Sequence, residues 1–155
     1  MFSKPLKIGL ISDTHNLVRP EAKRALAGVS LILHAGDICG PEVLAHLGEI
    51  APVIAVRGNN DHGLWAASIP THETIEVGGV VIYMLHNLEE LDSRAPLMQV
   101  VVSGHTHRPL IKRKGGALFV NPGSAGPRRF KLPVSLAILE IDDSGIDARL
   151  ITLEC

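Results

Sequence analysis

The chain contains little cysteine, few aromatic side chains and almost no net charge. Only Cys39 and Cys155 are available for a disulfide, so a disulfide-stapled secreted framework is not expected and the cytoplasm is the expected compartment. Aromatic residues make up 3% of the chain and the formal net charge is -1. Without a basic stripe or interleaved aromatics, neither a nucleic-acid-binding module nor a surface for anionic membranes is predicted.

Long hydrophobic runs are also missing. No segment approaches the roughly 18 apolar residues that a membrane-spanning helix needs, so no membrane association is expected. The apolar stretch 6–12 ends at Asp13 and has no small-residue cleavage pattern behind it, so it does not read as a signal peptide. With 46% hydrophobic and 20% charged residues, the 155-residue chain is predicted to fold as a single globular domain, residues 1–155.

Strand-like and helix-like segments alternate in the first half and favour a parallel βαβαβ unit. Helices are expected from Pro20 and from Pro41 to about Leu47, because proline suits the first helical position and a glutamate follows each proline. The expected strands are residues 6–12, 29–34 and 52–56.

Most strands of the second half are predicted to form antiparallel hairpins around glycine-containing turns. A short helical stretch is expected near residues 91–96. The expected strands are residues 73–77, 80–85, 99–103, 110–112, 117–121, 134–141 and 146–153. Two sheets packed face to face with helices outside would cover the many strands that are apolar on both sides.

Five of the predicted strands stop at a side chain that can bind a metal ion. In an open α/β sheet, ligands collect beyond the carboxyl ends of the strands, so these side chains are expected to meet at one site. They are Asp13, His15, Asp37, Asn59, His86, His105 and His107. Oxygen and nitrogen donors without a thiolate suit Mn, Fe, Zn, Co or Ni and disfavour a structural zinc clip.

Two details refine this expectation. An extended backbone would put Asp13 and His15 on the same side, because side chains alternate along a strand. Asp37 follows a glycine turn, and its two carboxylate oxygens could bridge two ions.

Taken in order, these blocks resemble the calcineurin-like metallophosphoesterases. The blocks are Asp13-Thr14-His15, Gly36-Asp37, Gly58-Asn59-Asn60-Asp61, His86 and Gly104-His105-Thr106-His107, and Asn121-Pro122-Gly123-Ser124 is similar to a further block of the small bacterial and archaeal phosphodiesterase branch. The resemblance implies the metallo-dependent phosphatase fold, an α/β four-layer αββα sandwich of two mixed sheets flanked by helices.

The resemblance also implies a dinuclear metal site and a reaction. One ion would take Asp13, His15, Asp37 and His107, and the other Asp37, Asn59, His86 and His105. The expected cofactors are two divalent ions, with Mn as the first choice and Fe, Zn, Co or Ni as alternatives. The implied activity is hydrolysis of phosphodiesters by in-line attack of a metal-bridging hydroxide.

The sequence departs from the family pattern beside two of these ligands. Many members carry a histidine directly after the metal-binding asparagine, where it is thought to protonate the leaving alkoxide; here that residue is Asn60. An amide has no proton to transfer near neutral pH, so slow turnover biased toward good leaving groups is predicted. His62 is a candidate substitute acid, although a loop histidine usually faces water. Beside His86, Asn87-Leu88 replaces the His-Gly-His pattern of many relatives.

Other residues have a functional and a structural interpretation. His34 is either a partner that orients Asp37 or a hydrogen-bonded buried histidine, and Cys39 is either redox-sensitive or a small buried side chain. Trp65 either stacks on an aromatic substrate or packs at a sheet edge. Arg128 and Arg129 either clamp a phosphate or lie solvated at the surface.

Three functions compete: the phosphodiesterase, a phosphomonoesterase or nucleotidase on the same site, and a non-catalytic scaffold like the retromer subunit that shares this fold. A scaffold would be expected to have lost ligands, and all seven are present. The expected partner is a small phosphate ester, with no nucleic-acid scaffold and no membrane. The oligomeric state, a homo-oligomer included, is left open.

Overall fold

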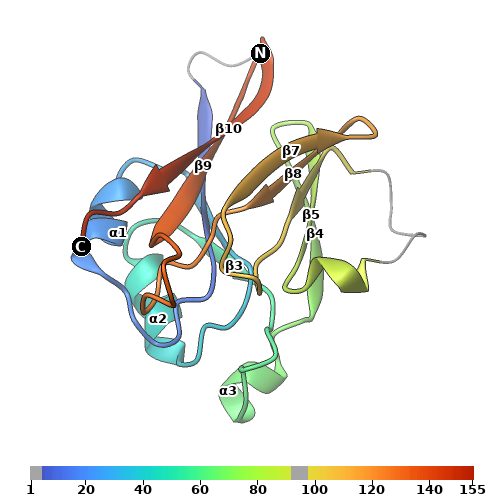
Figure 1. The fold of residues 1–155 in the computed structure, drawn as a ribbon. Coiled ribbons are helices and arrows are strands. Elements are labelled where there is room, and N and C mark those ends of the chain that lie inside the picture. Colours follow the sequence, from blue (N-terminus) through green and yellow to red (C-terminus); the bar gives the residue numbers. More distant parts are fainter. Residues whose placement is uncertain (1–4, 92–97) are drawn as a thin grey trace.

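The computed structural model describes residues 5–91 and 98–155, which form two five-stranded mixed sheets. The sheets lie next to each other, with helices at the outer side of one of them (Figure 1). The predicted fold class of two mixed sheets in an α/β arrangement is confirmed.

The first sheet joins the βαβαβ unit to the last hairpin of the chain. Its order is β10-β9-β1-β2-β3, with β1 Leu6–Ile11, β2 Leu31–His34, β3 Val53–Ala55, β9 Ser135–Asp142 and β10 Gly145–Thr152. β1, β2 and β3 are parallel, as expected. β9 pairs antiparallel with β1, so the C-terminal hairpin extends this sheet.

The second sheet has the order β4-β5-β6-β8-β7. Its strands are β4 His72–Val77, β5 Val80–Leu85, β6 Val100–Val102, β7 Leu110–Lys114 and β8 Ala117–Asn121. The β4–β5 and β7–β8 pairs are the antiparallel hairpins expected from their glycine turns. β6 departs from this pattern, because it lies parallel to both β5 and β8.

The main hydrophobic core lies between the two sheets. It joins Leu10 and Leu139 of the first sheet to Met84, Val102 and other apolar side chains of the second. Strands of both sheets therefore bury one face here, which explains why so many read as continuous apolar runs.

Helices cover the other face of the first sheet. α1 Pro20–Ala25 and α2 Pro41–Gly48 each begin with proline at the first turn and bury Leu26, Val43 and Leu47 in a second apolar cluster. On the outer face of the second sheet the described layer is thin. It consists of the 3₁₀ turn η1 Leu88–Glu90 and a small cluster around Tyr83.

Two short elements were not predicted, namely η1 and α3 Leu64–Ala67. The helical stretch expected near 91–96 lies, except for its first residue, outside the described residues. None of the helices in the described chain is long and apolar enough to cross a bilayer.

Candidate metal centre

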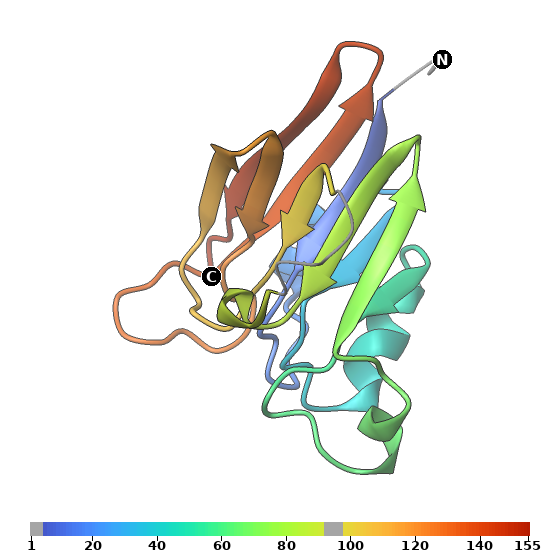
Figure 2. The same cartoon turned by 90° about the vertical axis from the view of Figure 1, so that its right-hand side faces the viewer.

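The predicted ligands lie at one end of the molecule, beyond the carboxyl ends of parallel strands from both sheets. α3 lies at this same end, whereas the turns of the β4–β5 and β9–β10 hairpins lie at the other (Figure 2). Asp13 N donates to Gly36 O at 3.0 Å and His15 N donates to Asp37 O at 3.0 Å, so the loops after β1 and β2 are held together. Gly104 N donates to His86 O at 2.9 Å and fixes the loops after β5 and β6 in the same way.

Most of the candidate ligands have a left-handed backbone. The φ angles are 54° at Asp13, 45° at His15, 57° at Asp37, 73° at His105 and 63° at His107. Non-glycine residues rarely adopt this region, and such strain concentrates at functional sites. The expectation of an extended backbone at Asp13 and His15 is therefore wrong, although their side chains do converge.

Glycines allow the loops to approach this closely. A Cβ atom at Gly36 would lie 2.7 Å from His86 Nδ1. At Gly58 it would meet the Asp37 backbone nitrogen and carboxylate, and at Gly104 it would meet the Ser12 hydroxyl. Each of these glycines precedes a candidate ligand, so any side chain there would push two ligands apart.

Asp13, His15 and His107 form a first group whose donor atoms all lie within 4.8 Å of one another. His107 Nε2 lies 3.4 Å from Asp13 Oδ1 and 3.4 Å from His15 Nε2. Asp13 Oδ2 accepts hydrogen bonds from Ser12 Oγ at 2.8 Å and His105 N at 3.0 Å. Among the described residues Asp13 Oδ1 is buried with no hydrogen-bond partner, as expected of an oxygen that binds an ion.

Asp13, Asp37 and His86 form a second group with the same spacing. His86 Nε2 lies 3.4 Å from Asp37 Oδ2 and 3.9 Å from Asp13 Oδ1. His105 Nδ1 joins this group, 3.3 Å from His86 Nε2 and 3.1 Å from Asn59 Oδ1. Asp37 Oδ2 is also 3.8 Å from His15 Nε2, so both carboxylates border both groups.

The hydrogen bonding of His86 tests whether this donor set fits a cation. His86 Nδ1 lies 2.7 Å from Ala35 O, and because a carbonyl only accepts, Nδ1 carries the proton. In a neutral ring, Nε2 would then aim its lone pair at Asp37 Oδ2. Two electron-rich atoms at 3.4 Å repel unless a proton or a metal ion lies between them. The cluster therefore fits positive charge.

The electrostatics of the two partners agree with this conclusion. Burial opposes the charged form of Asp37, but hydrogen bonds from His86 and Asn60 outweigh it and hold the pKa of Asp37 well below its usual range. Burial would lower the pKa of His86, but the carboxylates of Asp37 and Asp13 outweigh it and raise that pKa above its ordinary value.

Both candidate catalytic residues are exposed, and Asn60 also hydrogen-bonds to the cluster. Asn60 N donates to Asp37 Oδ1 at 2.9 Å, and Asn60 Nδ2 donates to Asp37 Oδ2 at 2.9 Å. The Asn60 amide therefore orients a candidate ligand. His62 lies at the surface in the loop before α3.

Asp61 is a buried carboxylate whose role the sequence does not predict. Its Oδ2 accepts from Asp37 N at 3.0 Å and Gly58 N at 2.8 Å, and its Oδ1 accepts from Cys39 N at 2.8 Å. Three backbone donors on two loops are satisfied by one side chain. The only signal for this role was its place at the end of the Gly58–Asp61 block.

The Asn121–Ser124 block also positions candidate ligands. Asn121 Nδ2 donates to Gly104 O at 3.0 Å and to Thr106 Oγ1 at 3.2 Å, and so fixes the turn that carries His105 and His107. Ser124 Oγ donates to Asp13 O at 2.9 Å. The loop after β8 thus fastens the ligand loops of both sheets.

His34 is completely buried and fully hydrogen bonded. Its Nδ1 accepts from Gly36 N at 3.1 Å, which leaves Nε2 as the donor to Thr14 Oγ1 at 2.9 Å. Its two hydrogen bonds therefore hold Gly36 and Thr14, which lie on either side of the loops that carry Asp37 and Asp13. Burial lowers the pKa of His34 to about 4 from 6.5, although the carboxylates of Asp13, Asp61 and Asp37 act in the opposite direction.

This lowered pKa predicts acid sensitivity of the fold. Between about pH 4 and 6.5 the unfolded chain binds a proton at His34 that the folded chain does not, so stability falls as the pH falls through this window. From pH 7.5 to pH 5 the loss at this residue is about 2 kcal/mol. Urea unfolding of chelator-treated protein at the two pH values measures it. His34→Asn keeps an acceptor for Gly36 N and should remove that part of the pH dependence; an unchanged dependence would contradict the assignment.

Cys39, Trp65 and the two arginines of the 128–129 pair lie in three different environments. Cys39 Sγ is 3.5 Å from His15 Nδ1, and burial together with the Asp61 carboxylate raises the pKa of this thiol to about 11, which disfavours a reactive thiolate. Trp65 is half-buried and packs against the apolar cluster beneath α1 and α2. Arg128 and Arg129 are exposed.

Comparison with known proteins agrees with this geometry. Residues 6–144 match the calcineurin-like phosphoesterase superfamily domain. The chain belongs to this family. It is 36% identical over 160 residues to a probable metallophosphoesterase of Methanothermobacter thermautotrophicus, a match that covers 93% of this chain and 91% of that protein.

Solved structures show the same fold. A protein described as a novel archaeal phosphodiesterase superposes with a TM-score of 0.79 at 25% identity, covering 96% of this chain and 100% of that one. Vacuolar Protein Sorting 29 of Cryptosporidium parvum has a TM-score of 0.75 at 19% identity, covering 97% and 99%, and shares the fold alone. The family consists of phosphoester hydrolases. In this chain the residues that could hold a metal ion are Asp13, His15, His107, Asp37 and His86.

Proposed function

We propose that the chain is a dinuclear metal-dependent phosphodiesterase. The observation that carries the proposal is the convergence of two carboxylates and three imidazoles, which a fourth imidazole, that of His105, joins through His86. Asp13 Oδ1 is buried there and lacks a hydrogen-bond partner in the described chain. The proposed ligands are Asp13, His15, Asp37, Asn59, His86, His105 and His107. When bound, a pair of divalent ions would lower the pKa of a water molecule and neutralise charge on the phosphoryl group.

The protein residues have separate tasks in this proposal. Asp13 and Asp37 offset only part of the charge of two divalent ions, so the site stays cationic and attracts a phosphate anion. Ser12 Oγ donates to Asp13 Oδ2 and Asn60 Nδ2 donates to Asp37 Oδ2, and these hydrogen bonds hold the two carboxylates in place. The Ala35 carbonyl fixes the proton of His86 on Nδ1, so that Nε2 is free to coordinate.

Manganese is the proposed physiological ion, with Fe, Zn, Co or Ni as alternatives. The proposed donor atoms are oxygen and nitrogen. Cys39 Sγ lies 3.5 Å from His15 Nδ1, whereas Nε2 is the atom of His15 that faces the other ligands. A site of this kind holds borderline and hard cations, and thiolate-seeking ions have no advantage in it.

A phosphodiester is the proposed substrate class. The archaeal phosphodiesterase with a TM-score of 0.79 supports this choice over a monoester. A neutral amide at Asn60 also fits an ester whose leaving group needs little help. The substrate is expected to be a small molecule in the cytoplasm, bound without a membrane or a nucleic-acid scaffold.

Metal analysis together with turnover of a chromogenic phosphodiester tests the proposal. We expect close to two divalent ions per chain after loading with Mn²⁺, hydrolysis of bis(4-nitrophenyl) phosphate, and slower hydrolysis of 4-nitrophenyl phosphate. Treatment with a chelator should abolish the activity and Mn²⁺ should restore it. A protein that binds no ions and stays inert with every ion tried would instead support the scaffold function, and a preference for the monoester would support the phosphomonoesterase.

A further inference from the structure

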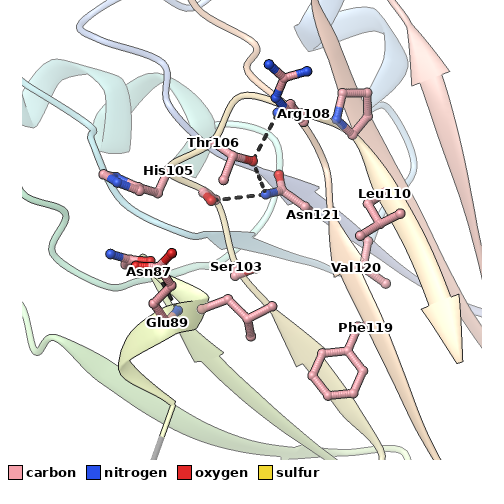
Figure 3. Close-up of a pocket in the computed structure, with 13 residues that line it drawn as sticks. Asn87, Glu89, Ser103, His105, Thr106, Arg108, Leu110, Phe119, Val120 and Asn121 are labelled. Atoms are coloured by element: carbon pink, nitrogen blue, oxygen red, sulfur yellow. Dashed lines mark hydrogen bonds between the residues drawn. The ribbon is translucent and has the colours of Figure 1, made fainter. Parts of the chain in front are cut away.

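A cavity of about 870 Å³ opens beside the candidate metal centre, and His105 is part of its wall. Figure 3 shows His105 and Thr106 at one end of the cavity and Phe119 at the other, with Leu110 along the side. Since His105 Nδ1 also lies 3.3 Å from His86 Nε2, the cavity begins where the ligand cluster ends. Its volume is typical of pockets that hold small molecules.

The wall of this cavity exposes apolar side chains to solvent. Leu88 and Leu110 are 38% and 51% exposed, and both lie in the wall together with Phe119. Single exposed leucines are common on proteins, but two of them beside a phenylalanine in one concave site indicate a ligand.

Several polar groups of the wall are hydrogen-bonded to one another. Thr106 Oγ1 accepts from Asn121 Nδ2 at 3.2 Å and from Arg108 N at 3.2 Å (Figure 3). The wall contains one cationic and one anionic side chain, Arg108 and Glu89, so its formal charge is zero. The wall therefore presents carbon surface without a strong field, which suits a neutral, bulky apolar group.

We propose that this cavity binds an aromatic or other bulky apolar substituent of a phosphodiester whose phosphoryl group lies at the metal centre. The proposal rests on the proposed function and adds a substrate class to it. A diester carries two organic groups, so one of them can lie in the cavity beside His105 while the bond to the other is hydrolysed. Small dialkyl phosphates would leave the apolar wall in water and gain nothing from it.

The test combines kinetics with a binding measurement that does not depend on turnover. Two esters are compared, bis(4-nitrophenyl) phosphate and methyl 4-nitrophenyl phosphate, and the measured quantity is the kcat/KM of the first divided by that of the second. In the double variant Leu88→Ala/Leu110→Ala, we expect this ratio to fall about tenfold. Comparing ratios between proteins cancels the different reactivities of the two esters. By calorimetry, the preference for phenylphosphonate over methylphosphonate should fall by a similar factor. Leu150→Ala is the matched control, because Leu150 is 38% exposed on β10 and is not part of the cavity wall.

The outcomes separate the two proposals. If both esters are hydrolysed and neither ratio changes in the double variant, the aromatic subsite is overturned and the phosphodiesterase stands. The wild type could instead hydrolyse neither ester and still bind phenylphosphonate more tightly than methylphosphonate. If the double variant loses that preference, the aromatic subsite stands and the phosphodiesterase activity is overturned. If the leucines hold two copies together, sedimentation shows the double variant losing a dimer while the binding ratio stays constant, which overturns the subsite.

Discussion

Replacing Asp13 by asparagine is expected to lower kcat/KM for a phosphodiester by at least about 1,000-fold. Asp13 Oδ1 faces His107 Nε2 at 3.4 Å and His86 Nε2 at 3.9 Å, so the substitution removes one negative charge shared by both groups of donors. The ion content after loading with Mn²⁺ should fall from about two to one or less. Elemental analysis of the desalted protein measures this directly.

The same variant is expected to fold at least as stably as the wild type when both are free of metal. In the chelator-treated wild type a buried carboxylate oxygen has no hydrogen-bond partner among the described residues, and such a charge is costly. An asparagine can keep its oxygen toward Ser12 Oγ and His105 N and turn its amide toward the imidazoles. Metal-free thermal unfolding should therefore begin at the same or a higher temperature, whereas the rise in Tm on adding Mn²⁺ should disappear.

Asp147→Asn is the matched control, because Asp147 is an exposed residue near the start of β10, and the β9–β10 turn lies at the end of the molecule opposite α3 (Figure 2). It should keep the activity, the ion content and the Mn²⁺-dependent rise in Tm. If Asp13→Asn retained two ions and full activity, Asp13 would not be a ligand and the proposed centre would be wrong.

The sequence was informative where a local pattern decides the structure. Apolar runs ending at Asp13, Asp37 and His86 predicted strands that end at a shared site, because the carboxyl ends of parallel strands meet at one edge. Proline at the first turn predicted where α1 and α2 begin, and double glycines predicted the β4–β5 and β7–β8 hairpins.

Pairings between distant segments were not predictable in this way. The β9–β10 hairpin has its own turn signal, but nothing local specifies that β9 pairs with β1, more than 120 residues earlier, and completes the first sheet. The parallel pairing of β6 with β8 also depends on the β7 hairpin folding outward to the sheet edge. Such contacts are set by the shape of the whole core.

Strain at the ligands was hidden for a different reason. A left-handed backbone at Asp13 and His15 contradicts local preference and persists only because the surrounding loops hold it. Those loops are held by side chains such as Asp61 and Asn121, whose hydrogen bonds go mostly to backbone groups. A sequence pattern identifies the side chain that could bind a metal, but it does not reveal the neighbour that positions it.

Introducing histidine at Asn60 is expected to change how the rate depends on the leaving group. The Asn60 amide donates to Asp37 Oδ2 at 2.9 Å and has no proton to transfer near neutral pH, so a basic leaving group must depart unassisted. Across phosphodiesters of increasingly basic phenols, log(kcat/KM) should therefore fall steeply in the wild type. In Asn60→His the slope should become shallower, with a gain of about 10- to 100-fold for the most basic leaving group and little change for 4-nitrophenolate.

The pH profile and a control variant separate proton donation from a general effect on the site. A histidine that acts as an acid must be protonated, so Asn60→His should lose activity at alkaline pH where the wild type does not. Asn60→Gln has a longer amide with no transferable proton and should keep the steep slope. The hydrogen bond from the backbone nitrogen of residue 60 to Asp37 Oδ1, at 2.9 Å, does not depend on the side chain, so Asp37 should stay in place. The Mn²⁺ content should therefore be equal in all three proteins. If the slope of Asn60→His matches that of the wild type at equal Mn²⁺ content, leaving-group protonation at this position is not what limits the reaction.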